Sequence, residues 1–220
     1  MRHAETMSVL EDALAGHTVV VAFPAGGVSD WVAVGEVLAD EGLTAWAWPA
    51  DRLDQLPDVV SMFGRRVRIG VAGALDPDGR EAAARHGAAF WLSPLAVSPD
   101  EGAPLPYLAG ALTPNEVAAV AAGREGAPVL VVPADALGTS FARTLPVLVP
   151  GVPVVPWGRL ERYQCEMWLE AGAVAVVVQD VIVRPEISAD VNPLEEVGRR
   201  AASFGNWRQP ETERAVGVGP

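Results

Sequence analysis

The side chains that could do chemistry in this sequence follow the ends of short apolar runs. Trp157, Arg159 and Asp180 follow the seventh and eighth of these runs. Arg52 and Ser93 follow the second and the fourth. An arginine and a carboxylate beside an aromatic ring can bind a small polar or zwitterionic ligand through charge-assisted hydrogen bonds and cation–π contact. The same residues could instead form a surface ion pair over an aromatic plug, and both interpretations stay open.

Schiff-base chemistry is nearly excluded by composition. The chain contains no lysine, and all 16 of its basic residues other than histidine are arginine. The amino terminus of Met1 is therefore the single primary amine, and an iminium requires such a group in its neutral form. We expect Met1 to begin a helix far from the candidate residues, so it is a poor candidate for this chemistry.

Metal and thiol chemistry are weakly indicated. The three histidines are scattered and share no metal-ligand spacing. Asp51, Asp135 and Asp180 could together bind a hard cation, but we interpret them as solvated loop acids and predict no metal and no cofactor. Cys165 lies in a predicted helix with no histidine nearby in sequence, which indicates a structural thiol rather than a nucleophile.

Eight short apolar runs indicate the strands that would position these residues. Most of them lack alternation between apolar and polar residues, which is typical of parallel strands buried on both faces. The runs span residues 17–23, 43–48, 66–72, 89–92, 105–109, 129–132, 152–155 and 174–178.

Helix signals lie between the runs. Thr113 and Glu116 match a capping box with Pro114 at the first helical position, which predicts a helix from Thr113 onward. Amphipathic patterns predict further helices over 4–15, 30–41, 76–86, 161–170 and 194–204. Two segments, 96–104 and 136–149, contain glycine and proline, so we expect both to be short or irregular.

This alternation of strands and helices predicts a small (β/α)₈ TIM barrel with an N-terminal helix. The alternative is an open doubly wound sheet, which favours a G-x-G-x-x-G turn after the first strand. The turn at 24–28 lacks that spacing. We predict one barrel domain over 1–204 and a C-terminal tail over 205–220.

Composition restricts the partners and the compartment. The formal charge of −12 repels nucleic acid and anionic membranes, so we predict neither as a partner. No apolar run reaches the roughly 20 residues that a membrane-spanning helix needs. A single cysteine indicates a reducing compartment, and we predict a cytoplasmic protein.

Four short motifs occur in a characteristic order. Residues 109–117 contain a glycine followed, after two residues, by Thr-Pro-Asn-Glu, and residues 87–94 read Gly-Ala-Ala-Phe before a Ser-Pro. Pro-Ala-Asp at 133–135 and Pro-Trp-Gly at 156–158 follow. Over 19–183 the chain resembles the 2-keto-3-deoxy-6-phosphogluconate and 4-hydroxy-2-oxoglutarate aldolases. The resemblance implies a (β/α)₈ class I aldolase that is usually a trimer and acts on a 2-oxo acid.

The resemblance also shows which chemical groups this chain lacks. The family's Schiff-base lysine lies three residues before the Pro-Ala-Glu proline, and Leu130 holds that position here. Ala47 holds the position of the general acid/base glutamate. Leucine cannot form an iminium and alanine cannot transfer a proton, so we predict no catalytic residue. Other family positions differ as well, and they are held by Pro24, Asp51, Gly73, Arg159 and Asp180.

Tryptophans are frequent, at seven in the chain. Trp46, Trp48 and Trp157 are predicted at strand ends, where they would line or fill the barrel mouth. Trp31 and Trp168 are predicted on helices, where packing or subunit contacts are the expected roles.

Three hypotheses follow. The leading one is a pseudo-aldolase that lacks class I activity, forms a homo-oligomer (a trimer by resemblance), and binds a small 2-oxo acid or another small polar ligand through Arg52, Ser93, Trp157, Arg159 and Asp180. The second is a rewired lyase that acts on a 2-oxo acid through a metal or rim carboxylates. The third is an oligomeric assembly module with an occluded pocket.

Overall fold

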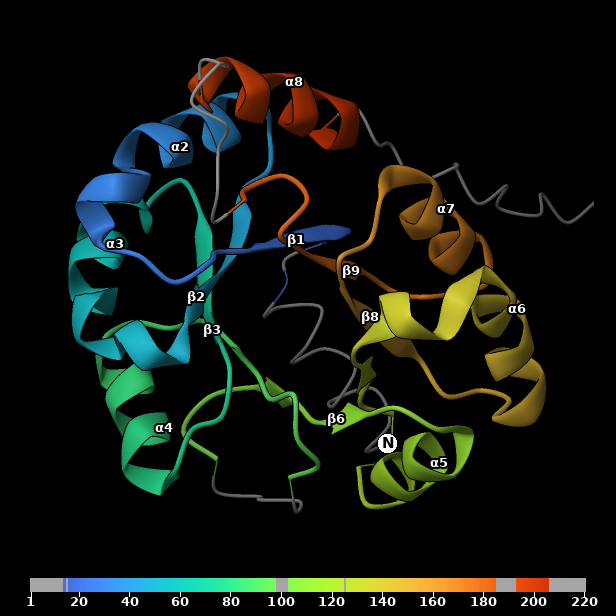
Figure 1. Cartoon of the computed structure of the whole chain (residues 1–220). Helices are drawn as coiled ribbons and strands as arrows, with labels where there is room; N and C mark the ends of the chain where they lie inside the picture. The colour runs from blue at the N-terminus through green and yellow to red at the C-terminus, as the bar shows by residue number, and fades with distance from the viewer. Residues whose placement is uncertain (1–13, 15, 98–102, 125, 185–192, 206–220) are drawn as a thin grey trace, which may run out of the picture.

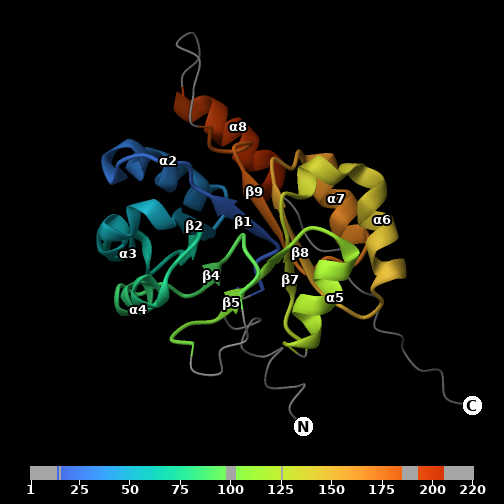
Figure 2. The same cartoon turned by 60° about the horizontal axis from the view of Figure 1, so that its bottom comes forward.

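Nine parallel strands form one sheet that nearly closes into a barrel (Figures 1 and 2). The computed structural model describes residues 14, 16–97, 103–124, 126–184 and 193–205. The strands are β1 (Val19–Ala22), β2 (Ala45–Pro49), β3 (Arg68–Ala72), β4 (Trp91–Leu92), β5 (Tyr107–Leu108), β6 (Gly110–Ala111), β7 (Val129–Val131), β8 (Val154–Gly158) and β9 (Val176–Gln179). This architecture confirms the predicted barrel.

The barrel closes through one stretch of chain. The strand order is β5-β4-β3-β2-β1-β9-β8-β7-β6, so β5 and β6 form the two edges of the sheet. Only Ala109 separates these edges in sequence. Leu92 pairs with Leu108 on one side, while Leu130 pairs with Gly110 on the other. β5 and β6 therefore act together as one fifth strand, which gives the eight strand positions of a (β/α)₈ barrel.

Seven α-helices surround the sheet in the part of the chain that the structure describes (Figure 1). They are α2 (Val28–Asp40), α3 (Leu56–Phe63), α4 (Pro77–Arg85), α5 (Pro114–Ala122), α6 (Gly138–Leu148), α7 (Arg162–Glu170) and α8 (Pro193–Gly205), with the 3₁₀ helices η1 (Ala50–Gln55) and η2 (Ala134–Leu137). None of these helices combines the length and apolar composition that crossing a bilayer requires.

The predicted capping box starts α5. Thr113 Oγ1 accepts a hydrogen bond from Glu116 N at 3.3 Å, and Glu116 Oε2 accepts one from Thr113 N at 2.7 Å. These contacts satisfy backbone donors that a helix leaves free at its first turn. They also hold the pKa of Glu116 below its usual value, because the carboxylate accepts hydrogen bonds from the Thr113 and Leu112 backbone N–H groups.

Two helices differ from the sequence prediction. The segment 136–149, expected to be short or irregular, contains the 11-residue helix α6. Pro146 lies in the last turn of α6, so it interrupts little of the helix, while Ala142 and Leu145 bury one face. Helix α3 was not predicted at all, although Leu56, Val59 and Phe63 form its buried face.

Several predictions fall largely outside the described residues. Of the predicted helix over 4–15 only Leu14 is described, and it is buried. The tail over 205–220 is described only at Gly205, which ends α8. Residues 98–102 of the segment 96–104 also lie outside the described part. The division into a domain and a tail thus stays a prediction.

The buried residues form two layers. The outer layer lies between the strands and the helices. The inner layer fills the lumen of the barrel and, apart from Leu14, comes only from the sheet and the residues that adjoin its strands. Its buried members are Leu14, Val20, Ala22, Ala45, Ala47, Phe90, Leu92, Leu108, Leu130, Val155, Trp157, Ala175 and Val177. Successive residues of a strand point to opposite faces, so each strand contributes to both layers.

Candidate functional site

The lumen of the barrel carries an apolar lining where the resemblance places the family's chemistry. Leu130 on β7 and Ala47 on β2 both belong to the inner layer, and neither is exposed to solvent. Leu130 pairs with Gly110 on one neighbouring strand and with Val155 on the other. These positions offer no group that could exchange a proton or form a covalent bond with a carbonyl.

Trp157 is the large aromatic residue of the lumen. It lies near the end of β8, is 7% exposed, and packs with the inner layer. Its indole Nε1 is buried without a hydrogen-bond partner among the described residues. An unpaired buried donor costs about 1–3 kcal/mol. The site therefore holds one polar group that an acceptor could satisfy.

The other two tryptophans expected at the mouth point away from it. Trp46 and Trp48 belong to the outer layer, because Ala45 and Ala47 take the inward positions of β2. The Trp46 indole Nε1 donates to Leu43 O at 2.5 Å. The Trp48 Nε1 donates to the backbone oxygen of Arg52 at 3.1 Å. The prediction that both residues line or fill the mouth was wrong.

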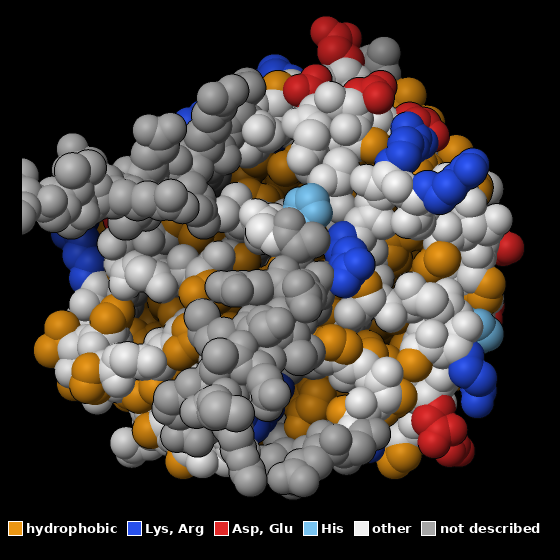
Figure 3. Space-filling view, turned by 180° about the vertical axis from the view of Figure 1, so that it is seen from behind, with side chains coloured by type: hydrophobic (Ala, Val, Ile, Leu, Met, Phe, Trp, Pro, Cys, Tyr) orange, Lys and Arg blue, Asp and Glu red, His pale blue; other side chains and the backbone are white. Residues whose placement is uncertain are grey.

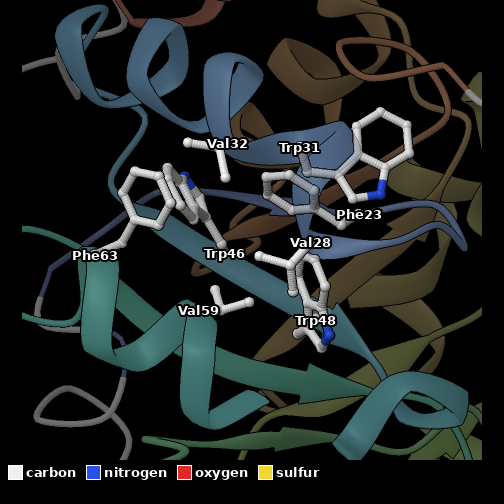
Figure 4. A pocket seen from close by; sticks show the side chains of 8 residues that line it. All are labelled: Phe23, Val28, Trp31, Val32, Trp46, Trp48, Val59 and Phe63. Atoms are coloured by element: carbon white, nitrogen blue, oxygen red, sulfur yellow. The ribbon is translucent and has the colours of Figure 1, made fainter. Parts of the chain in front are cut away.

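These tryptophans belong instead to an aromatic cluster between the sheet and the helices α2 and α3 (Figure 4). The ring of Phe23 lies 5.3 Å from that of Trp46 and 5.4 Å from that of Trp48, measured between centroids. The cluster borders a pocket of about 10 Å³, which is room for about one water molecule. The pocket is lined by Phe23, Val28, Trp31, Val32, Trp46, Trp48, Val59 and Phe63.

The predicted rim residues lie in separate segments, each of which follows a different strand. Arg52 in η1 and Arg159 after β8 are exposed, and Asp180 after β9 is half-buried. No ion pair joins Arg159 to Asp180, both of which the structure describes. Asp180 Oδ2 instead accepts a hydrogen bond from Gln179 Nε2 at 3.3 Å. The backbone of Asp180 has a φ of 54°, an unusual value for a residue with a side chain.

The hydroxyl of Ser93 forms hydrogen bonds within the turn that follows β4. The side chain is 1% exposed, and its Oγ donates to Leu95 O at 3.0 Å. The same Oγ accepts a hydrogen bond from Leu95 N at 3.3 Å. This hydroxyl supports the loop after β4, and a ligand would have to compete for it.

Two polar residues at this end of the barrel lie outside the predicted set of ligand-binding residues, although Asp135 is among the acids considered from the sequence as cation ligands. Gln179 takes the next inward position of β9 after Val177 and is half-buried. Asp135 in η2 accepts a hydrogen bond from Arg159 N at 3.2 Å through Oδ1. Counting inward positions along β9 from Val177 identifies Gln179. The position of Asp135 depends on the fold of the loop after β7, which no sequence pattern reports.

The described residues assemble no group that is suited to metal or thiol chemistry. Among the described residues no cluster of three His, Cys, Asp or Glu side chains could hold a metal ion, so Asp51, Asp135 and Asp180 do not gather. Cys165 is buried, and its Sγ lies 3.7 Å from Leu160 O. Burial raises the pKa of this thiol to about 12, so the reactive thiolate is scarce at neutral pH.

The comparison with known proteins identifies similar solved structures but no matching family. No family model and no curated protein matches the chain. A 2-keto-3-deoxy-6-phosphogluconate aldolase of Zymomonas mobilis, solved with 3-phosphoglycerate, is similar with a TM-score of 0.73 at 14% identity, over 92% of this chain and 98% of that chain. A KDPG aldolase of Legionella pneumophila, with pyruvate captured as a covalent carbinolamine, has a TM-score of 0.71 at 18% identity, over 87% and 95%.

A third similar structure is a designed one. It is a cube-shaped protein cage made by fusing symmetric oligomeric domains, with a TM-score of 0.73 at 21% identity. The match covers 86% of this chain and 70% of that chain. At such identities the likeness shows that this chain shares the barrel fold of these aldolases.

Proposed function

We propose that this protein is an aldolase-like barrel without class I Schiff-base activity, a pseudo-aldolase that binds a small ligand at the carboxyl end of its strands. The observation that carries the proposal is the apolar lumen around Leu130. An iminium on an internal side chain needs a lysine, and the chain has none. Ala47 on β2, which also belongs to the inner layer, offers no carboxylate for proton transfer.

The ligand class follows from the groups that remain near the mouth. Trp157 offers an unpaired N–H, and Arg52 and Arg159 offer exposed guanidinium groups. Guanidinium groups bind carboxylates and phosphates in a planar, two-pronged geometry. Asp180 would repel an anion but could bind an amine. A small 2-oxo acid or another small polar ligand fits these groups, with Ser93 as a further, weaker contact.

We further propose that the protein is a cytoplasmic homo-oligomer. A trimer is the form that the resemblance to the aldolase family favours. The likeness to a cage built from symmetric oligomeric domains supports a homo-oligomer in general. The assembly-module alternative is favoured by a separate observation, the inward packing of Trp157 among apolar residues.

The deciding experiment measures pyruvate release from 2-keto-3-deoxy-6-phosphogluconate and from 4-hydroxy-2-oxoglutarate by purified protein. Each substrate is tested with magnesium, with manganese and with EDTA, beside an active class I aldolase as the positive control. We expect no release under any condition. Release that EDTA abolishes would replace the proposal with the rewired, metal-dependent lyase. Release that survives EDTA would direct attention to the Met1 amine.

Ligand binding is tested separately by thermal shift and calorimetry with pyruvate, 2-oxoglutarate and phosphate. The matched variant is Arg52→Gln/Arg159→Gln, which removes two exposed charges without touching the lumen. Binding that this variant loses supports a ligand site at the rim. Failure of the native protein to bind any of these probes would favour the assembly module.

A further inference from the structure

An exposed apolar surface lies at the amino-terminal end of the barrel, on the side opposite the candidate ligand site. Val147 and Leu148 end α6 and are 78% and 57% exposed. Val174, which precedes β9, is 38% exposed, and its backbone N donates to Val154 O at 3.0 Å. Helices α6 and α7 are in contact and run in the same direction, since each connects two parallel strands. Their carboxyl ends therefore lie together, and we call this surface the α6–α7 patch.

The described residues that form the patch are uncharged. No residue from Thr144 to Pro153, at the end of α6 and in the loop before β8, is charged, although 20% of the whole chain is. Hydrophobic side chains gather toward the left edge of the back view, on the α6 and α7 side (Figure 3). Exposed apolar patches with a polar border are typical of protein–protein contacts.

Two charged residues border the patch, with opposite signs. Arg143 is exposed on α6 one helical turn before Val147, and Glu170 is exposed at the end of α7. Within the described residues neither forms an ion pair, whereas the nearby Arg162 and Glu166 pair with each other at 2.9 Å. Among the described residues, the border thus carries a cation and an anion without an ion-pair partner, beside an apolar centre.

Because its two sides carry opposite charges, this patch can contact the same patch of another copy, either in a dimer or around the three-fold axis of a trimer. We infer that the α6–α7 patch docks a second copy of this chain, with the apolar centres in contact and Arg143 of one copy beside Glu170 of the other. Because each copy carries a charge of −12, contact between copies is favoured where the buried surface is uncharged and the border pairs opposite charges. The inference rests on the proposed homo-oligomer and assigns its contact surface.

The test compares variants by sedimentation velocity and light scattering at micromolar protein concentration. The native protein is expected to be an oligomer and Val147→Glu a monomer, since a carboxylate at the centre of the contact would be buried without a partner. Met62→Glu is the matched control, because Met62 is an exposed apolar residue (43%) on α3, away from the patch. Circular dichroism confirms that each variant is folded.

A charge swap tests the pairing itself. Arg143→Glu and Glu170→Arg should each weaken association by about tenfold or more, and the double variant should restore it. An oligomeric Val147→Glu variant would overturn the patch while leaving the homo-oligomer intact. A monomeric native protein would overturn both the patch and the homo-oligomer. Neither result bears on the aldolase assay, so the proposed loss of aldolase activity and the proposed contact surface can fail independently of each other.

Discussion

The carboxylate of Asp135 occupies the space that a side chain at position 158 would need. A Cβ added to Gly158 would collide with Asp135 Oδ1 and would lie 3.1 Å from the backbone N of Asp135. The same Oδ1 accepts the hydrogen bond from Arg159 N. The end of β8 and the loop after β7 are thus fastened together beside Trp157, at the carboxyl end of the barrel.

Gly158→Ala should therefore destabilise the fold by about 1–3 kcal/mol, because Asp135 must move and release Arg159 N. Urea denaturation measures the effect. The double variant Asp135→Ala/Gly158→Ala should lose much less stability than the two single variants lose together, since the clash is then absent. Additive losses would mean that the close approach of Asp135 is not what excludes a side chain at Gly158.

A second prediction concerns the pH dependence of stability. Partial burial, and to a lesser degree the charge of Arg68, lower the pKa of His17 from its ordinary value of 6.5. The unfolded chain then binds a proton more readily than the folded one, so stability is full above the ordinary pKa and falls as the pH drops through about 6.5 toward the folded value.

His17→Asn should flatten this part of the stability curve between about pH 7 and pH 5. Denaturant titrations at several pH values measure it, and an NMR titration of the His17 ring reports the pKa directly. Arg68→Gln removes one of the two causes and should move the His17 pKa part of the way toward 6.5. A His17 ring that titrates above its ordinary value would contradict the burial argument.

A third prediction separates the contribution of the Trp157 ring volume to stability from the contribution of its unpaired N–H. Trp157→Phe keeps an aromatic ring in the lumen and removes the orphan donor, so stability should change by less than about 1 kcal/mol. Trp157→Ala leaves a cavity and should cost about 3–5 kcal/mol. If Trp157→Phe were as damaging as Trp157→Ala, the indole N–H would have a partner that the described residues do not show.

The barrel could be predicted from sequence because its strands are buried on both faces, so each appears as an unbroken apolar run. The same property hides which face a residue takes. On β2 the order Ala-Trp-Ala-Trp is apolar throughout, and hydropathy alone does not say that Ala45 and Ala47 point inward. Packing decides it, because Trp46 and Trp48 pack against Phe23 in the layer between the sheet and the helices α2 and α3.

The rim could not be predicted, because loops set its geometry. Arg159 and Asp180 follow neighbouring strands, a position that favours a pair, yet among the described residues no ion pair joins them. Asp180 has a positive φ and contacts Gln179, while the backbone of Arg159 is bonded to Asp135. The resemblance correctly indicated the fold.

The fourth prediction concerns a variant that places an amine at position 130, where the resemblance puts the family's lysine. In Leu130→Lys the new side chain would lie in an apolar lumen, where burial favours its neutral form and lowers its pKa. A neutral amine adds to the ketone of pyruvate, and the adduct takes up a proton from solvent and loses water to give an iminium. Borohydride then delivers hydride to leave a stable secondary amine. Mass spectrometry with peptide mapping should locate this adduct on the peptide that contains residue 130.

The native protein and Leu130→Met are the matched controls, since neither adds an amine and methionine nearly preserves the volume of leucine. A buried lysine is costly, so circular dichroism must first show that Leu130→Lys is folded. Adducts on the native chain at Met1 would identify a different amine as the reactive one. A folded Leu130→Lys variant without an adduct would show that pyruvate cannot enter the lumen, and would favour the assembly module over a ligand-binding barrel.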